Sequence, residues 1–225
     1  MRAMILAAGL GYRMRPLTLK IPKPMLPIAG KPLLQHHIER LATVGIRELI
    51  INTHWLPHII EDYFKTGETF GVSIEWSREA RLLDTGGAVV AALPFLGTAP
   101  FLLLNGDIWT DYPLERLIEN GVGNDLDAHL VLVDNPNHNL TGDFSLSRRK
   151  VTLLNPDISF GHTFAGLSVW RPEIFASFGA KNEAFPLKKI LNQIIQLDRV
   201  TGELYAGEWC DIGDLSRYKQ LLTQI

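Results

Sequence analysis

The sequence predicts an α/β fold: a Rossmann-like, mostly parallel sheet with helices on both faces. Two observations predict it. Short apolar runs alternate with segments of helical periodicity through residues 1–140, which is the pattern of repeated strand–helix units. The run from Pro100 to Asn105 is apolar on both faces, as a central strand of a parallel sheet is when helices cover both its sides.

The first part of the chain contains the predicted parallel strands and the helices that connect them. The strands are predicted at 2–7, 47–53, 72–77, 100–105 and 128–134, and the helices at 31–44, 56–65, 86–93 and 113–120. Pro32 and Pro57 fit the first turns of two of these helices, because proline has no backbone N–H to leave unpaired there.

After residue 140 the apolar runs become shorter. Strands or a hairpin are predicted at 142–146, 150–154 and 163–170, helices at 172–178, 186–197 and 214–224, and an extended segment at 202–211. No linker, internal repeat or low-complexity stretch separates this part from the first. We therefore expect a single domain over residues 1–225, in which the second part caps the first and adds a small β subregion.

The positive charge of the chain is concentrated at its start. Residues 1–38 contain six Lys and Arg and no Asp or Glu, whereas the whole chain has 22 basic and 24 acidic residues and a net charge of −2. A local basic patch suits a small anionic ligand better than a nucleic acid. No apolar run reaches the roughly 18 residues of a membrane helix, and the run at residues 3–8 is too short for a secretory leader.

The chain has a single cysteine, Cys210, which excludes an intrachain disulfide. Such sparse use of cysteine agrees with a reducing compartment. We expect a cytoplasmic protein, a monomer or a small homo-oligomer, with no nucleic-acid or membrane partner.

A glycine loop follows the first predicted strand. Gly9 and Gly11 stand where strand 2–7 ends, and without Cβ atoms they allow phosphate oxygens to approach the backbone N–H groups. The loop is not a Rossmann fingerprint, because Met14 stands where a third glycine is required, and no Gly-Lys-Ser/Thr of a P-loop follows. The alternative interpretation is a basic surface turn with two incidental glycines.

Three cations accompany this loop. Arg13 and Arg15 follow the glycines and can meet phosphate charge. Lys23 lies between two prolines, which stiffen its backbone and aim its ammonium. At the α-phosphate of a nucleotide such a lysine would stabilise the charge that develops during phosphoryl transfer. The loop and its cations together predict a polyphosphate-binding site.

Asp107 and Asp211 are candidate ligands of a divalent cation. Asp107 follows the predicted central strand, and in open parallel sheets ligands bind beyond the carboxyl ends of the strands. Asp211 ends the late extended segment. Because Mg²⁺ takes a few carboxylates together with phosphate oxygens, two aspartates from distant parts of the chain would suit it. The alternative for Asp211 is a strand end or a helix cap, although Asp214 is the better cap.

The complete N-terminal run resembles the nucleotidyltransferase family that activates sugar 1-phosphates. The family pattern reads Leu-Ala-Ala-Gly-x-Gly-x-Arg, Pro-Leu-Thr, Pro-Lys-Pro and Lys-Pro, and residues 6–9, 11, 13, 16–18, 22–24 and 31–32 match it. The resemblance covers essentially the whole chain and implies the nucleotide-diphospho-sugar transferase fold. It implies nucleotide binding by the loop residues Ala8, Gly9, Gly11, Tyr12, Arg13 and Lys23.

The same resemblance implies the catalytic group and the metal. Lys23, Arg13 and Asp107 are the implied catalytic residues, and Asp107 and Asp211 are the implied ligands of Mg²⁺. Residues 1–140 are then mainly the nucleotide-binding half, and residues 141–225 are mainly the sugar-binding and closing half.

The resemblance also implies contacts with the base and the sugar. The segment from Leu83 to Ala88 is similar to a family segment that borders the nucleobase. It implies nucleotide contacts by Asp84, Thr85, Gly86 and Gly87, and the resemblance as a whole also implies one by Asn105. Asp84 stands where the family has a glycine, and Thr85 is alternatively the N-cap of a helix.

Gly142 and Asn155 are the implied sugar contacts. Gly142 begins a Gly-Asp-Phe run that resembles a family segment near the sugar. Asn155 stands in Leu-Asn-Pro, where many members have Glu-Lys-Pro, so the lysine that grips the sugar phosphate is missing at that place. The alternative is that both are ordinary turn residues.

Within the family, the chain most resembles the short uridylyltransferases of bacterial cell-wall recycling. This resemblance rests on residues 52–56, 85–87, 104–112, 130–136 and 142–144. It implies that UTP and N-acetylmuramic acid 1-phosphate react by in-line attack on the α-phosphorus, with release of pyrophosphate and no covalent enzyme intermediate.

Three other functions stay open. One is the same reaction on glucose or mannose 1-phosphate, and the second is a cytidylyltransferase that acts on phosphocholine. The third is a non-catalytic regulatory subunit that binds nucleotide sugars. The presence of Lys23, Asp107 and Asp211 argues against the third, because a sensor does not need a metal and a lysine in the same site.

Overall fold

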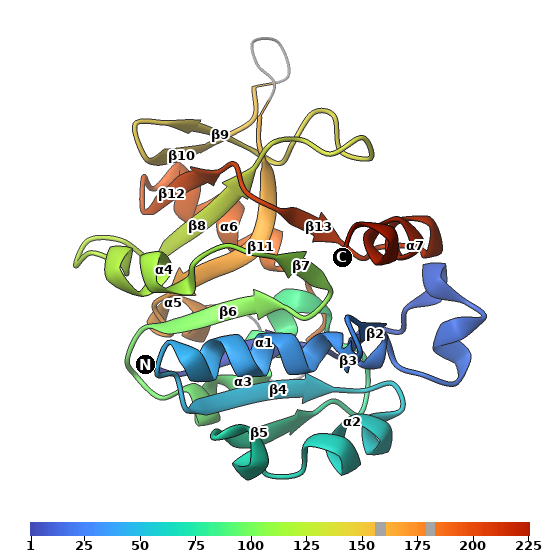
Figure 1. Ribbon diagram of the computed structural model, residues 1–225. Coiled ribbons are helices and arrows are strands. Elements are labelled where there is room, and N and C mark those ends of the chain that lie inside the picture. The colour runs from blue at the N-terminus through green and yellow to red at the C-terminus, as the bar shows by residue number, and fades with distance from the viewer. Residues whose placement is uncertain (156–160, 179–182) are drawn as a thin grey trace.

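The computed structural model describes residues 1–155, 161–178 and 183–225, and within these residues the centre of the fold is a nine-stranded sheet (Figure 1). From one edge to the other its strands are β5 (Ser73–Arg78), β4 (Glu48–Thr53), β1 (Ala3–Leu6), β6 (Phe101–Asn105), β11 (Thr163–Trp170), β8 (Ala128–Val133), β12 (Val200–Tyr205), β10 (Lys150–Leu153) and β9 (Phe144–Ser147).

Most strands of this sheet run in the same direction. β5, β4, β1 and β6 are mutually parallel, and β12 is parallel to β8. β11 lies antiparallel to both β6 and β8, so β8 has the direction of β6. β10 is antiparallel to both of its neighbours. The mostly parallel sheet predicted from the sequence is confirmed, with β11 and β10 as the two reversed strands.

Helices cover both faces of the sheet, as the sequence predicts (Figure 1). One face carries α1 (Leu33–Thr43), α2 (Pro57–Phe64) and α4 (Leu114–Asn120), and the other carries α3 (Asp84–Leu96), α5 (Glu173–Ala176) and α6 (Leu187–Gln196). Successive side chains of a strand point to opposite faces. In β1, Ala3 and Ile5 therefore pack in the first core and Met4 packs in the second.

Two short ribbons lie outside the main sheet. β7 (Ile108–Thr110) pairs antiparallel with β13 (Trp209–Asp211), and β2 (Pro27–Ile28) pairs antiparallel with β3 (Lys31–Pro32). Single 3₁₀ turns are η1 (Tyr12–Met14), η2 (Leu17–Leu19), η3 (Lys23–Met25) and η4 (Glu68–Phe70). Among the described residues, no helix has both the length and the apolar character needed to cross a lipid bilayer.

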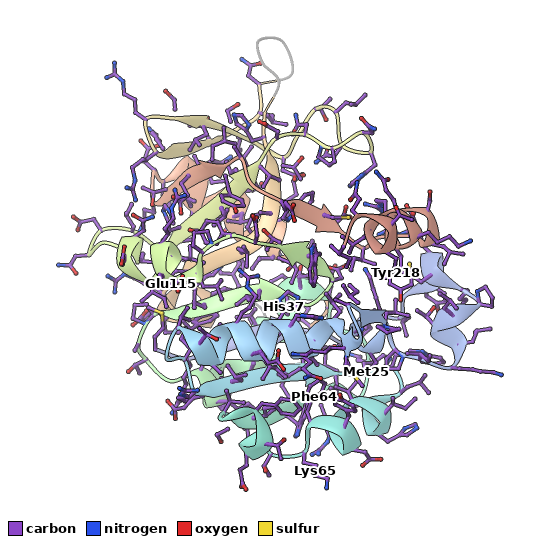
Figure 2. All side chains as sticks on the ribbon, viewed as in Figure 1. Met25, His37, Phe64, Lys65, Glu115 and Tyr218 are labelled. Carbon is purple, nitrogen blue, oxygen red and sulfur yellow. The ribbon has the colours of Figure 1, made fainter. Side chains whose placement is uncertain are left out.

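The last helix, α7 (Leu215–Gln224), packs the C-terminal end of the chain against the N-terminal segment. Met14, Leu26 and Ile28 form a small apolar cluster with Ile212 and Tyr218. Figure 2 shows Tyr218 between α7 and the N-terminal segment, and its hydroxyl donates a hydrogen bond of 2.7 Å to the carbonyl of Pro27. This contact holds the end of the chain against the segment that carries the glycine loop.

The observed elements differ from the sequence-based ones in several places. The segment expected at 202–211 is two strands, because β12 joins the main sheet whereas β13 pairs with β7. β7 was not predicted, and Lys31 lies in β3 rather than in a helix. Thr85 is not a helix cap: it lies inside α3, where its hydroxyl accepts a hydrogen bond of 2.8 Å from the backbone of Leu187.

Candidate active site

A cavity of about 400 Å³ opens at the carboxyl ends of β1, β4 and β6, which are neighbours in the sheet. These three strands contribute Leu6, Asn52 and Asn105 to the lining of the cavity. Most of the residues predicted for the site line it, namely Ala8, Gly9, Gly11, Tyr12, Arg13, Lys23, Asp84, Thr85, Asn105 and Asp107. The parallel strand ends bring these residues to one edge, as the rule for open sheets requires.

The glycine loop has a fixed shape. Gly11 adopts a left-handed conformation with φ of 61°, and a Cβ there would lie 2.8 Å from the Cγ2 of Thr18. The Thr18 hydroxyl donates a hydrogen bond of 2.7 Å to the Gly11 carbonyl. A Cβ on Gly9, in contrast, would have no atom within 4 Å and would face open space. Packing against Thr18 therefore requires a glycine at position 11. At position 9 packing does not require one, and the missing side chain leaves space in the cavity.

The two arginines after the loop have different surroundings. Arg13 is exposed and lines the cavity, as predicted. The guanidinium of Arg15 lies 4.2 Å from the centre of the Tyr12 ring, and Arg15 is not among the lining residues. A cation over an aromatic face is a stabilising contact in itself. Arg13 is thus the arginine that a bound anion would meet.

Two buried polar residues that sequence reasoning did not assign hold the cavity walls together. Asn52 accepts a hydrogen bond of 2.7 Å from the backbone of Ala7 and donates one of 2.7 Å to Glu79. Glu79 in turn accepts a hydrogen bond of 2.9 Å from the backbone of Leu83. Burial raises the pKa of the Glu79 carboxyl, although the hydrogen bond from Asn52 opposes this. The pair ties the glycine loop to the start of α3.

At the start of α3, Asp84 has a left-handed backbone conformation. Its φ is 58°, in the left-handed region, which aspartate tolerates better than most residues because its short side chain bonds locally. Its carboxylate accepts a hydrogen bond of 2.6 Å from the backbone of Thr85. Asp84 therefore keeps a left-handed turn at this position and adds a carboxylate to the cavity wall.

Lys23 and Asp107 form an ion pair inside the cavity. Lys23 begins η3 directly after Pro22, and its side chain is only 10% exposed. Asp107 follows β6, and its side chain is 40% exposed. A nearly buried ammonium therefore faces a carboxylate that is open to solvent and to any ligand in the cavity.

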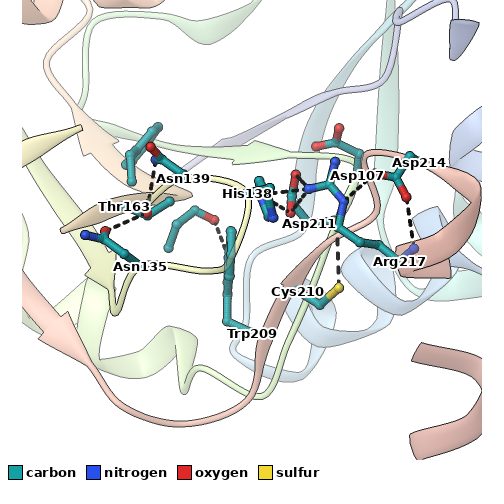
Figure 3. A network of polar contacts seen from close by, with 12 residues as sticks. Asp107, Asn135, His138, Asn139, Thr163, Trp209, Cys210, Asp211, Asp214 and Arg217 are labelled. Carbon is teal, nitrogen blue, oxygen red and sulfur yellow. Dashed lines mark hydrogen bonds and ion pairs between the residues drawn. The ribbon is translucent and has the colours of Figure 1, made fainter. Parts of the chain in front are cut away.

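The β7–β13 ribbon brings Asp211 to Asp107. Asp211 pairs with Ile108 in the ribbon, and the backbone of Ile212 donates a hydrogen bond of 2.8 Å to the carbonyl of Asp107. Figure 3 shows the two aspartate side chains next to each other. Asp211 itself is not among the cavity-lining residues, but Gly213 is. The structure thus brings the two predicted metal ligands together, with Asp107 in the cavity and Asp211 beside it.

Asp211 is already paired with two basic side chains (Figure 3). The Nη1 of Arg217 donates to both carboxylate oxygens, and the Nε2 of His138 lies 3.0 Å from one of them. Arg217 also donates through Nε to Asp214, at 2.9 Å. Asp214 is the N-cap of α7, as the sequence predicts, since it accepts a hydrogen bond of 3.0 Å from the backbone of Arg217.

A polar network fixes the loop that carries His138 (Figure 3). Thr163 donates a hydrogen bond of 2.9 Å to Asn135 and accepts one of 3.1 Å from Asn139. Asn135 also donates a hydrogen bond of 2.8 Å to the carbonyl of Gly161. His138 and Arg217 were both missed by sequence reasoning. The partners of His138, Asp211 and Arg217, lie far away in the chain, and no local pattern distinguished Arg217 from an ordinary basic residue of the last helix.

The chemistry of the donor set fits a divalent cation that arrives with a polyphosphate. Asp107 and Asp211 offer hard oxygen ligands of the kind that Mg²⁺ takes. In the part of the chain that the structure describes, no group of three or more His, Cys, Asp or Glu could hold a metal by itself. Phosphate oxygens and water would therefore have to complete the coordination.

Cys210 lies next to Asp211 but has the properties of an unreactive thiol. Burial, and then the neighbouring Asp211 carboxylate, raise the pKa of the thiol above its ordinary value. A thiol with a raised pKa is a weak nucleophile at neutral pH, because the thiolate is the reactive form.

Gly86 and Gly87 lie outside the lining of the cavity. A Cβ on Gly86 would lie 2.4 Å from the Phe185 ring, and one on Gly87 would lie 2.2 Å from the carbonyl oxygen of Glu183. Both backbone N–H groups donate to the Phe185 carbonyl, at 2.9 and 3.1 Å. Close packing on this segment accounts for both glycines, and their contact with a nucleobase stays a prediction.

Gly142 and Asn155 also lie outside the lining. Gly142 has φ of 75°, and a Cβ there would lie 2.6 Å from the carbonyl carbon of Gly161. Asn155 is exposed at the border of residues 156–160, which are outside the described residues. The sugar contacts expected of both residues stay predictions.

Comparison with known protein sequences relates the chain to enzymes of nucleotide transfer. The profile of the nucleotidyl transferase family matches residues 2–144. The N-acetylmuramate alpha-1-phosphate uridylyltransferase of Neisseria meningitidis serogroup B is 42% identical, over 98% of this chain and 96% of that protein. A mannose-1-phosphate guanyltransferase of Gibberella zeae is 31% identical, over 95% of this chain and 61% of that protein.

Comparison with solved structures identifies the fold. A candidate glucose-1-phosphate thymidylyltransferase of Bacillus anthracis, solved with sucrose, superposes with a TM-score of 0.89 at 18% identity, over 100% of this chain and 95% of that one. HddC of Yersinia pseudotuberculosis, solved with GMP-PN, superposes with a TM-score of 0.80 at 22% identity, over 99% and 98% of the two chains. At these identities the likeness concerns the fold alone.

Proposed function

The chain belongs to the nucleotidyl transferase family, and from this premise we propose that it transfers a uridylyl group from UTP to N-acetylmuramic acid 1-phosphate. Pyrophosphate is the second product. The observation that carries the choice of substrates is the 42% identity with the meningococcal uridylyltransferase, which extends over 98% of this chain. The family resemblance seen in the sequence is confirmed, whereas the two substrates are our proposal.

The N-terminal side of the cavity supports the triphosphate-binding role. The open space at Gly9 lets phosphate oxygens approach the backbone, and Arg13 faces the cavity as an exposed cation. In our proposal Arg13 and the loop amides hold the β- and γ-phosphates. Lys23, which is fixed on η3, neutralises charge at the α-phosphorus as pyrophosphate leaves. The fixed positions of these cations supply the pre-organisation that in-line transfer needs.

Asp107 and Asp211 are the proposed ligands of Mg²⁺. When bound, the ion supplies charge neutralisation on the phosphates and helps to align the reacting groups. The ribbon that joins the two aspartates supports this role, because it brings Asp211 next to Asp107, which lines the cavity. Without the ion, Lys23 balances the charge of the Asp107 carboxylate and Arg217 balances that of the Asp211 carboxylate.

The two halves of the chain are proposed to divide the substrates. All lining residues of the cavity except Gly213 belong to residues 1–140, which supports the assignment of the nucleotide to the first half. Residues 141–225 then provide the sugar side and the second metal ligand. Since UTP is a metabolite of the cytoplasm, the proposal includes the cytoplasmic location expected from the sequence.

The test is pyrophosphate release from a matrix of substrates. Purified protein with Mg²⁺ is offered UTP, dTTP, GTP or CTP, each with N-acetylmuramic acid 1-phosphate, glucose 1-phosphate, mannose 1-phosphate or phosphocholine. We expect UTP with N-acetylmuramic acid 1-phosphate to give the highest kcat/KM, by at least about tenfold over the other pairs. The Asp107→Asn protein, prepared in parallel, controls for contaminating activity.

Two outcomes would overturn this proposal in different ways. A higher kcat/KM for GTP with mannose 1-phosphate would indicate that the protein transfers a guanylyl group to mannose 1-phosphate instead. Nucleotide-sugar binding in calorimetry without pyrophosphate from any pair would indicate a regulatory subunit.

A further inference from the structure

Each of the two carboxylates proposed to bind metal is occupied by a cation of the chain itself. Lys23 pairs with Asp107, and Arg217 pairs with Asp211. A divalent cation that takes both carboxylates must weaken both pairs, because each carboxylate charge is then shared with the metal. Lys23 has a use after this exchange, since it faces the nucleotide. Arg217 has none in the reaction as described so far.

The structure holds the Arg217 guanidinium at two places, and only one of them involves a proposed metal ligand. Its Nε donates a hydrogen bond of 2.9 Å to Asp214, which is fixed as the N-cap of α7, while its Nη1 faces Asp211 and lies 2.8 Å from His138. If Asp211 turns to a metal, the tether to Asp214 keeps the guanidinium in place. Its outer nitrogen then faces the space beside the metal with an unsatisfied donor, next to the imidazole of His138.

This guanidinium lies against the wall of the cavity. A Cβ on Gly213 would lie 1.9 Å from the Nη2 of Arg217, and Gly213 lines the cavity. The absence of a side chain at position 213 is therefore what allows the arginine to approach the cavity from the side of the second carboxylate. Arg217 is 15% exposed at its side chain, so that an ion pair there is well shielded from solvent.

The acceptor substrate still lacks a partner for its phosphate. Lys23 and Arg13 lie on the nucleotide side, and Asn155, one of the two residues expected to contact the sugar, is uncharged, exposed and not part of the cavity lining. An arginine presents a planar fork of donors that matches phosphate oxygens, and it keeps its charge at all relevant pH.

We propose that Arg217, assisted by His138, binds the phosphate of the acceptor sugar 1-phosphate, and that Asp211 exchanges this arginine for the divalent cation. The inference rests on the proposed function, because it assigns a residue to its second substrate. It also links the two ligands: a metal on Asp211 frees the arginine, so metal and sugar phosphate strengthen each other's binding reciprocally.

The first experiment separates the two substrates kinetically. Arg217→Gln should raise the KM for the sugar 1-phosphate about ten- to hundredfold, the usual effect of losing a hydrogen bond between charged groups, and leave the KM for UTP within about twofold. The matched control is Arg2→Gln: Arg2 pairs with the exposed Glu48 at the opposite end of β1 and should change neither KM. Melting temperatures of both variants exclude misfolding as the cause.

The second experiment measures binding without turnover. In calorimetry without metal, Asp211→Asn should bind glucose 1-phosphate at least several-fold more tightly than the wild type, because the arginine has lost its charged partner. Glucose 1-phosphate serves as the phosphate-only probe, and N-acetylmuramic acid, which carries a carboxylate but no phosphate, serves as the second probe. Arg217→Gln should weaken binding of the first probe and leave the second unchanged.

Three results would overturn the inference. They are an unchanged KM for the sugar 1-phosphate in Arg217→Gln, an effect of that variant on N-acetylmuramic acid alone, and equal or weaker binding of glucose 1-phosphate by Asp211→Asn. Failure of the proposed function is distinguishable, since it appears as absence of pyrophosphate from the wild type. The calorimetric comparison remains decisive in that case.

Discussion

The two halves of the chain reach the same cavity by different means. In the first half, β1, β4 and β6 are parallel neighbours, and the loops that follow them supply the cavity residues directly. In the second half, Asp211 arrives through the short β7–β13 ribbon, and Arg217 through a helix beyond it. The first half forms its part of the site by local connections, whereas the second depends on contacts between distant segments.

The cations of the two halves differ accordingly. Within the described residues, Lys23 has one carboxylate partner, Asp107, and a stiff backbone between two prolines. Arg217 has two, Asp211 and Asp214, and a histidine beside it. The arginine can give up one partner and keep its position, but the lysine depends on its backbone for position. Both cations can therefore give up a carboxylate to a metal and stay in place, the arginine through a second ion pair and the lysine through its backbone.

The largest expected effect tests whether both halves hold the metal. Asp107→Asn and Asp211→Asn should each lower kcat on the order of 10³-fold, because each removes a charged ligand from the groups that stabilise the transferring phosphate. Steady-state kinetics over a range of Mg²⁺ concentrations measures this. Full Mg²⁺-dependent activity in Asp211→Asn, with loss in Asp107→Asn, would confine the metal to the first half.

The next effect concerns the cation of the first half. Lys23→Ala should lower kcat about 10²-fold and change the melting temperature little. The carboxylate that it leaves behind is 40% exposed and can be hydrated, and the lost ammonium was a nearly buried charge. Lys31→Ala, which breaks an exposed pair with Glu39 in the same segment, is the control. Proportional loss of melting temperature and activity would indicate that Lys23 serves the fold instead.

The sequence predicted the first half better than the second for a physical reason. Strand 2–7 was expected and β1 spans Ala3–Leu6; strand 47–53 was expected and β4 spans Glu48–Thr53. These strands are apolar runs whose burial is decided locally by the repeated strand–helix pattern. The glycine loop could likewise be predicted from the sequence, because its residues are adjacent in the chain.

What the sequence did not predict depends on long-range pairing. The three residues of β7 and of β13 are too few to show a period of two, and their pairing joins segments about a hundred residues apart. The hydrogen bond between Asn52 and Glu79 and the contacts of Arg217 with His138 have the same character. Polar side chains that fix other side chains carry no local signature, so the sequence could indicate the ligands but not their supports.

Among the described residues, two buried histidines of the first half, His37 and His129, have an Nε2 without a hydrogen-bond partner, and acid should distinguish them. Burial, and then the nearby Arg40, lower the pKa of His37 to about 4, from an ordinary 6.5. Burial also lowers the pKa of His129, but there the carboxylate of Glu203, 3.9 Å away, opposes the shift. Protonation in the folded state is therefore less favourable at His37 than at His129.

The sign of the resulting pH dependence follows from proton binding. Between pH 6.5 and about 4 the unfolded chain protonates residue 37 and the folded chain does not, so the stability contributed by His37 is present above this range and is lost as the pH falls through it. The loss amounts to about 3 kcal/mol. His37→Leu should flatten the decline of unfolding free energy, measured with urea at several pH values, and His129→Leu should flatten it less. A larger flattening in His129→Leu than in His37→Leu would show that His129, not His37, contributes more to the loss of stability in acid.

The smallest expected effects separate glycines that serve packing from a glycine that serves the ligand. Gly87→Ala should destabilise the fold by about 1–3 kcal/mol, because the new methyl group would meet the backbone carbonyl oxygen of Glu183 at 2.2 Å and one of the two backbone segments would have to shift. Gly9→Ala meets no atom within 4 Å and should leave the unfolding free energy within about 0.5 kcal/mol of the wild type.

The kinetic result should be the reverse of the stability result. Gly9→Ala places a methyl group where phosphate is proposed to approach the backbone, so the KM for UTP should rise several-fold while the KM for the sugar 1-phosphate stays unchanged. Gly87→Ala, assayed well below its melting temperature, should keep both KM values if its role is packing alone. A rise in the KM for UTP in Gly87→Ala at full stability would restore the nucleobase contact predicted from the sequence. An unchanged KM for UTP in Gly9→Ala would remove this glycine from the nucleotide site.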